Sequence, residues 1–181
     1  MGVSEGEKRR LYFDNSDYLN VVGYLKIDTY DKKYFQKNGV FLNIGFKWFL
    51  SSSDYNNNFN SFSQLKGKIG LAHTFSDKVT THFISEAGIT IGENNNRALD
   101  YNVGGYSENF INTFVPFYGY DFAELNANSF LRSGLTLRYE FLPKNYFSGA
   151  ANFARVERDL FNSGKIFENT KTGYMLGYGI D

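Results

Sequence analysis

The amino-acid sequence predicts an all-β protein built as an antiparallel, up-and-down β-barrel. Apolar and polar residues alternate with a period of two in successive segments of about ten residues, which is the pattern of strands with one dry face and one wet face. Clusters of Asn, Asp, Gly and Ser separate these segments, as turns and loops do. Helical periodicity is weak along the whole chain, so neither an all-helical nor an α/β fold is expected.

The alternating segments follow one another from the N-terminal region to the end of the chain. After a polar lead-in at residues 1–17, the segment 19–29 places Leu19, Val21 and Ile27 on one face. The clearest alternation lies at 131–141. Further strands are expected at residues 40–50, 65–71, 79–91, 145–156 and 172–180, with a weaker strand at 99–104. The expected wall therefore has about seven or eight strands.

The apolar runs of the chain limit how it could enter a membrane. No stretch reaches the roughly 18 to 20 consecutive apolar residues of a transmembrane helix, so insertion would have to use strands. Several segments have room for the roughly 9 to 11 residues of a tilted transmembrane strand. Aromatic side chains make up 19% of the chain and gather toward strand ends, as Trp48 does. These features favour a transmembrane barrel, although a soluble, lipocalin-like barrel that binds an apolar ligand has the same alternation and stays open.

The charged residues and the absent motifs exclude several classes of function. Lysines and arginines are scattered among equally numerous aspartates and glutamates, so nucleic acid is not an expected partner. The chain has no cysteine, and no nucleophile elbow, dinucleotide fingerprint or P-loop occurs in it. Its His82 and Glu86 lie four residues apart on one strand, about 13 Å by strand rise, which is too far to share a metal ion. We expect no catalytic centre, no metal and no cofactor in this chain.

The two faces of the expected strands differ in chemistry, and in a membrane barrel the polar face lines the lumen. The polar side chains that we expect to face the lumen are His82, Glu86, Arg132, Arg138 and Glu140. The side chains that we expect to face lipid are Leu131, Leu135, Leu137, Tyr139 and Phe141. Arg132, Arg138 and Glu140 could form ion pairs with groups on neighbouring strands, such as Glu86 or Lys68, or each could be hydrated separately.

One stretch, residues 105–128, is too long and irregular for a hairpin and is expected to be a functional loop. The sequence from Phe110 to Glu157 resembles the C-terminal barrel of bacterial patatin-like phospholipases. It includes the run VPFYGYDFAELNANSFLRSGLTLRYEF. That barrel is a branch of the BamA-like (bacterial surface antigen) superfamily. The resemblance implies a loop that folds back into the barrel with an Arg-Gly-aromatic motif. Its place here is held by Phe117, Tyr118, Gly119 and Tyr120, with Tyr118 where the motif has arginine.

The resemblance also implies a location and partners. It suggests a truncated part of a barrel of about sixteen strands in the outer membrane of a Gram-negative bacterium, without the closing C-terminal strands. The expected partners are outer-membrane lipid, the missing strands, an upstream domain of the parent protein and further copies of the chain. The implied function is to anchor, and help export, an attached patatin-like lipid hydrolase, whose catalytic motifs are absent from this chain. A BamA- or TamA-type assembly or translocation factor is the alternative.

Overall fold

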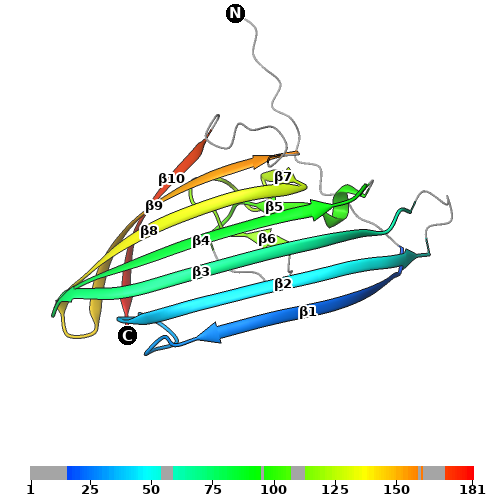
Figure 1. Ribbon diagram of the computed structural model, residues 1–181. Helices are drawn as coiled ribbons and strands as arrows, with labels where there is room; N and C mark the ends of the chain where they lie inside the picture. Colours follow the sequence, from blue (N-terminus) through cyan, green and yellow to red (C-terminus); the bar gives the residue numbers. More distant parts are fainter. Residues whose placement is uncertain (1–15, 54–58, 95, 107–112, 159, 161–169) are drawn as a thin grey trace, which may run out of the picture.

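The computed structural model of the protein describes residues 16–53, 59–94, 96–106, 113–158, 160 and 170–181. Seven long strands form one antiparallel sheet, the wall, in which each strand pairs with its neighbour in the order β1-β2-β3-β4-β8-β9-β10 (Figure 1). These strands are β1 (Tyr18–Asp28), β2 (Gly39–Ser52), β3 (Phe62–Ser76), β4 (Val79–Ile91), β8 (Ser129–Leu142), β9 (Asn145–Glu157) and β10 (Lys171–Ile180). The prediction of an all-β, antiparallel fold is confirmed.

The wall strands carry their apolar residues on the outside of the curve. In β8, the side chains of Leu135 and Leu137 are about half exposed, whereas Arg132 on the opposite face is 4% exposed. The outer face of β10 likewise exposes Leu176 and Tyr178. A soluble barrel buries its apolar face, so the pattern found here is that of a barrel whose outer face meets lipid.

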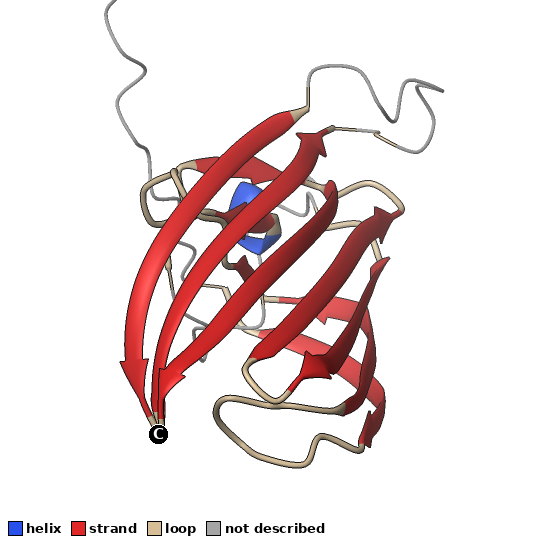
Figure 2. Cartoon of the chain, turned by 90° about the vertical axis from the view of Figure 1, so that its left-hand side faces the viewer, coloured by secondary structure: helices blue, strands red, loops and turns tan. Residues whose placement is uncertain are grey.

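A short helical turn and three short strands lie on the inner side of the wall, between β4 and β8 in the chain. They are η1 (Arg97–Leu99), β5 (Tyr101–Val103), β6 (Phe114–Val115) and β7 (Leu125–Ala127), and the strands form a second sheet in the order β6-β5-β7. Figure 2 shows the wall strands curving around this small body. No helix in the part of the chain that the structure describes is long and apolar enough to cross a membrane.

The prediction that residues 99–104 form a strand of the wall is wrong. Its residues form β5, which pairs with β6 and β7, and β4 pairs directly with β8 in the wall. The alternation is real, because Tyr101 and Val103 are both buried. However, those side chains pack between the small sheet and the wall. The stretch 105–128, expected to be irregular, also contains β6 and β7.

The core of the described residues lies between the wall and the inner body, which consists of η1, β5, β6 and β7. Tyr101, Val103, Val115, Phe117, Phe130 and Ala154 form one buried cluster. The rings of Tyr101 and Phe130 meet edge to face, with centroids 5.0 Å apart. Both rings lie over Gly88 of β4, where a Cβ atom would overlap Phe130 and approach Tyr101 to 2.8 Å. A residue without a side chain is therefore required where the inner body touches the wall.

We predict that Gly88→Ala destabilises the protein by about 1–3 kcal/mol, because an added methyl group overpacks the contact between Tyr101 and Phe130. The matched control is Gly45→Ala in the same cross-strand row and on the same inner face, where a Cβ would meet nothing within 4 Å. Urea unfolding in detergent, followed by heat-modifiable gel mobility, measures both changes. Equal losses of stability in the two variants would show that this contact is not tightly packed.

Candidate functional site

The inner segment is the part of the chain that comprises η1, β5, β6 and β7, and the structure describes it at residues 97–106 and 113–127. Polar side chains of β3 hold this segment against the wall. Gln64 Nε2 donates to the carbonyl of Leu99 at 2.8 Å. Lys66 Nζ donates to the carbonyl of Phe114 at 3.2 Å. In the other direction, the hydroxyl of Tyr101 donates to a backbone oxygen of β3 at 3.1 Å. Both the wall and the inner segment therefore supply donors that reach backbone oxygens across the interface.

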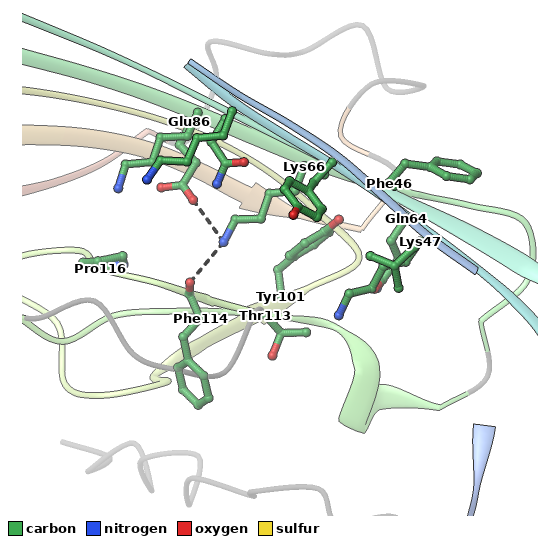
Figure 3. Close-up of a pocket in the computed structure, with 16 residues that line it drawn as sticks. Phe46, Lys47, Gln64, Lys66, Glu86, Tyr101, Thr113, Phe114 and Pro116 are labelled. Atoms are coloured by element: carbon green, nitrogen blue, oxygen red, sulfur yellow. Dashed lines mark hydrogen bonds and ion pairs between the residues drawn. The ribbon is translucent and has the colours of Figure 1, made fainter. Parts of the chain in front are cut away.

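Glu86 of β4 is the buried charge at the centre of this interface, and its side chain is 3% exposed. Lys66 Nζ lies 3.0 Å from one carboxylate oxygen, and Arg132 Nη1 of β8 lies 3.2 Å from the other. The pair with Arg132 was one of the expected ion pairs and is present, and Lys66, which was not among the expected partners, supplies a second cation. Figure 3 shows Lys66 between Glu86 and Phe114, so the same ammonium group joins the charge network to the inner segment.

A second contact holds the far end of the inner segment against β9 and β10. The amide of Asn152, in the orientation that satisfies both neighbours, donates to the Gly173 carbonyl at 2.8 Å and accepts from the Tyr118 N–H at 2.9 Å. Asn152 is fully buried. Gly173 has no side chain at the point where the Tyr118 carbonyl approaches, and a Cβ there would overlap that oxygen. Next in the chain, Gly119 has a φ of +83°, a backbone conformation that favours glycine.

The four residues expected to form the inward motif therefore lie on the inner side of the wall, with different surroundings. Phe117 is fully buried in the core, and its ring lies 5.3 Å from that of Tyr120. The Tyr118 ring lies beside Tyr106 of the same segment, at 5.9 Å. Tyr118 thus meets β9 and β10 through its backbone, and its ring packs within the inner segment.

Asp100 is a third contact point and is fully buried at the end of η1. Arg158, just beyond β9, places Nη2 2.6 Å from its carboxylate. Burial raises the pKa of the Asp100 carboxyl above its ordinary value, and the Arg158 guanidinium opposes that rise. Neither residue was identified in the sequence, because nothing local links positions 58 residues apart.

The connection between β1 and β2, residues 29–38, forms a strap along the inner side at the opposite end of the wall. Tyr30 reaches β4, where its hydroxyl lies 2.8 Å from His82 Nε2. Phe35 reaches β9 and stacks on Tyr146, with ring centroids 4.7 Å apart. The strap therefore spans from one side of the sheet toward the other.

Two of the expected lumen-facing charges of β8 meet this strap. Arg138 lies over the Phe35 ring at 5.0 Å and donates to the carbonyl of Gln36 at 3.2 Å. Lys37 Nζ lies 2.8 Å from a carboxylate oxygen of Glu140. The five expected polar residues thus divide into two groups, one around Glu86 under the inner segment and one, with His82, under the strap.

The side chains expected to face lipid lie on the opposite face of β8. Leu135, Leu137 and Tyr139 are 46–52% exposed there, and Leu131 is half-buried. Phe141 lies at a register shift in the pairing with β9, and its ring stacks on Phe147 at 4.6 Å. Together with Tyr178 these rings form an aromatic group near the end of the strands.

Comparison with models of known protein families places the chain in a family. A family model of the OMP85 superfamily matches residues 2–181, nearly the whole chain. No curated protein matches the sequence.

We predict that Gly173→Ala loosens the inner segment, because the new methyl group would displace the Tyr118 carbonyl. Hydrogen exchange of peptides covering residues 113–127, measured by mass spectrometry, should become at least about tenfold faster, which corresponds to about 1.4 kcal/mol of lost protection. The control is Gly177→Ala on the same face of β10, where a Cβ would come no closer than 3.9 Å to a neighbour. Unchanged exchange in Gly173→Ala would contradict this docking contact.

We further predict that Glu86→Gln destabilises the protein by about 3 kcal/mol or more, because it leaves Arg132 buried without its carboxylate. Glu140→Gln removes the pair with Lys37, both partners of which are more exposed, so its cost should be clearly smaller. Urea unfolding of both variants in the same detergent provides the comparison. A loss for Glu86→Gln no larger than that for Glu140→Gln would show that the buried network contributes little.

Proposed function

The chain belongs to the OMP85 superfamily, and we propose that it forms wall strands of an outer-membrane barrel that assembles or translocates other proteins. Membership indicates an outer membrane, of a Gram-negative bacterium or of an organelle, and a protein of the assembly or translocation type. We place it in a Gram-negative outer membrane. Lipid would contact the apolar outer face, and further strands of the barrel would pair with the edges of β1 and β10.

The observation that carries the proposal is the polar attachment of the inner segment to the wall. Gln64, Lys66 and Asn152 reach it through hydrogen bonds, and apolar packing is concentrated around Tyr101 and Phe130. Polar contacts of this kind can be exchanged for contacts with water or with a passing chain at modest net cost. A segment held in this way suits a barrel whose interior must at times accommodate another polypeptide.

A second function is favoured by the resemblance of residues 110–157 to the barrels of patatin-like phospholipases. In that case the barrel would anchor a lipid hydrolase, located in another part of the parent protein, and help to export it. OMP85 domains are generally not enzymes, and the residues of this chain would supply attachment to the membrane and no step of hydrolysis.

Deletion of the gene in its native host distinguishes the two functions. We expect lower steady-state amounts of other outer-membrane barrels or of exported proteins, measured by quantitative mass spectrometry of membrane and medium fractions. Complementation with the wild type and with Gly45→Ala should restore these amounts, whereas Gly173→Ala should restore them only in part. Loss of surface phospholipase activity with an unchanged set of outer-membrane and exported proteins would instead support the anchored hydrolase.

Contact of the outer face with lipid can be tested at two consecutive residues of β10. We predict that Leu176→Arg costs about 2–4 kcal/mol in lipid vesicles, because it places a cation on the lipid-facing side near mid-strand. Leu176 is 91% exposed on the outer face, whereas Met175→Arg places the same group on the inner face and should cost less. The folded fraction of each variant, read from heat-modifiable mobility after refolding into vesicles, gives the measurement. Equal costs would argue against a lipid-facing outer surface.

A further inference from the structure

The strap that joins β1 to β2 has a base that is continuous with the wall. The Thr29 N–H donates to the carbonyl of Val40 at 2.9 Å, and the Asp31 N–H donates to the carbonyl of Asn38 at 3.1 Å. The pairing of β1 with β2 therefore continues beyond the two strands. The side chain of Asn38 also accepts from the Thr74 N–H of β3 at 3.3 Å. Hydrogen bonds to backbone groups thus fix the base of the strap to β1, β2 and β3.

The tip of the strap, residues 32–37, is a loop that hydrogen bonds within the strap keep in shape. Oδ1 of Asp31 accepts from the N–H of Lys37 at 2.9 Å and so closes the loop across its base. Inside the loop, Nε2 of Gln36 donates to the carbonyl of Lys33 at 2.7 Å. A loop that is held by its own bonds can move as a unit about its base.

The tip crosses the inner face of the wall and reaches its last strands through side chains (Figure 2). Lys32 Nζ lies 2.5 Å from the carboxylate of Asp181, directly after β10. The Phe35 ring stacks on Tyr146 of β9 and covers Gly179 of β10, where a Cβ would lie 2.7 Å from that ring. Among the described residues, no hydrogen bond between backbone groups joins the tip to β8, β9 or β10. The tip can therefore leave these three strands without breaking any pairing in the wall.

Phe35, at the centre of these contacts, has a strained backbone. Its φ of +50° lies in the left-handed region, which a bulky side chain rarely adopts. The strain persists in the docked tip because Arg138 covers the ring from β8 at 5.0 Å and Tyr146 stacks on it from β9. Strain that surrounding contacts maintain is typical of segments that switch between two positions. Release of the ring would let this backbone relax.

We infer that the tip of the strap is a gate, which closes the lumen at the end where the β3–β4 and β8–β9 turns lie. The inference rests on the proposed function, because it requires the complete barrel. The gate opens when the ion pairs of Lys32 and Lys37 and the ring contacts of Phe35 are lost, while the base stays paired. Partly exposed polar contacts can be exchanged for water at modest net cost. A polypeptide that enters from this end can therefore displace the tip.

A pair of cysteines tests the gate reversibly in the full parent protein, reconstituted in a planar lipid bilayer. Phe35→Cys with Gly179→Cys removes the ring, so the time-averaged conductance should rise at least about tenfold above that of the wild type. A short bis-methanethiosulfonate that joins the two cysteines should return the conductance to the wild-type level, and a reductant should raise it again. The chain has no cysteine of its own, and the atoms that a Cβ at Gly179 would meet all belong to Phe35.

Phe35→Cys alone is the control, and it should stay conducting with and without the cross-linker. A conductance of the double variant no higher than that of the wild type would overturn the gate. So would a cross-link, verified by mass spectrometry, that leaves the conductance unchanged. Both outcomes leave the proposed barrel intact if heat-modifiable mobility shows folded, inserted protein, whereas a wild type that does not insert into lipid would contradict the proposed function itself.

Two charge-matched double variants repeat the test without altering the aromatic ring. Lys32→Gln with Lys37→Gln removes both ion pairs of the tip and should raise the time-averaged conductance at least about threefold. Lys33→Gln with Lys78→Gln removes the same charge at the same end of the wall and should leave the conductance unchanged. Lys33 lies over the ring of Tyr34 within the tip, and Lys78 is exposed in the β3–β4 turn. Equal conductance in the two double variants would overturn the inference.

Discussion

The carboxylate of Glu86 is the group on which the arrangement of the inner face most depends. It is buried on a strand in the middle of the wall, and a buried carboxylate is costly unless cations and hydrogen bonds surround it. Arg132 supplies one cation from the next strand, and Lys66 supplies the other while it also donates to the carbonyl of Phe114. Charge neutralisation in the wall and docking of the inner segment therefore share one ammonium group, so that a change in either one alters the other.

Two glycines of the inner face allow the inner segment to approach the wall closely. Gly88 leaves room for the rings of Tyr101 and Phe130, and Gly173 leaves room for the Tyr118 carbonyl, so the inner segment approaches the wall closely at both of its ends. At the other end of the strands, the strap at residues 29–38 contacts β4, β8 and β9. The inner face of this wall is thus contacted by two different pieces of its own chain.

The sequence was sufficient to predict the strands and their two faces, because alternation with a period of two is a local property. The sequence placed Glu86 and Arg132 on the polar face of alternating segments and so allowed an ion pair between them, but it left separate hydration open as the alternative. It did not predict that Lys66 joins Glu86 to the carbonyl of Phe114, because Phe114 lies 48 residues further along the chain. It placed β5 in the wall because a three-residue alternation such as Tyr101–Val103 looks the same in either sheet. Asn152 gave no signal, since its partners, Tyr118 and Gly173, lie far away in the chain.

In the proposed barrel, the apolar outer face of this wall meets lipid while the polar inner face holds the inner segment. Trp48 is the only tryptophan of the chain, and it lies 46% exposed on the outer face of β2, near the end of that strand. The most direct measurement is the quenching of its fluorescence after reconstitution into vesicles of brominated lipids. A lipid-facing Trp48 near the strand end should be quenched strongly, and more by bromine near the headgroup end of the acyl chain than by bromine near the methyl end. Fluorescence that brominated lipid leaves unchanged in the folded protein would contradict it.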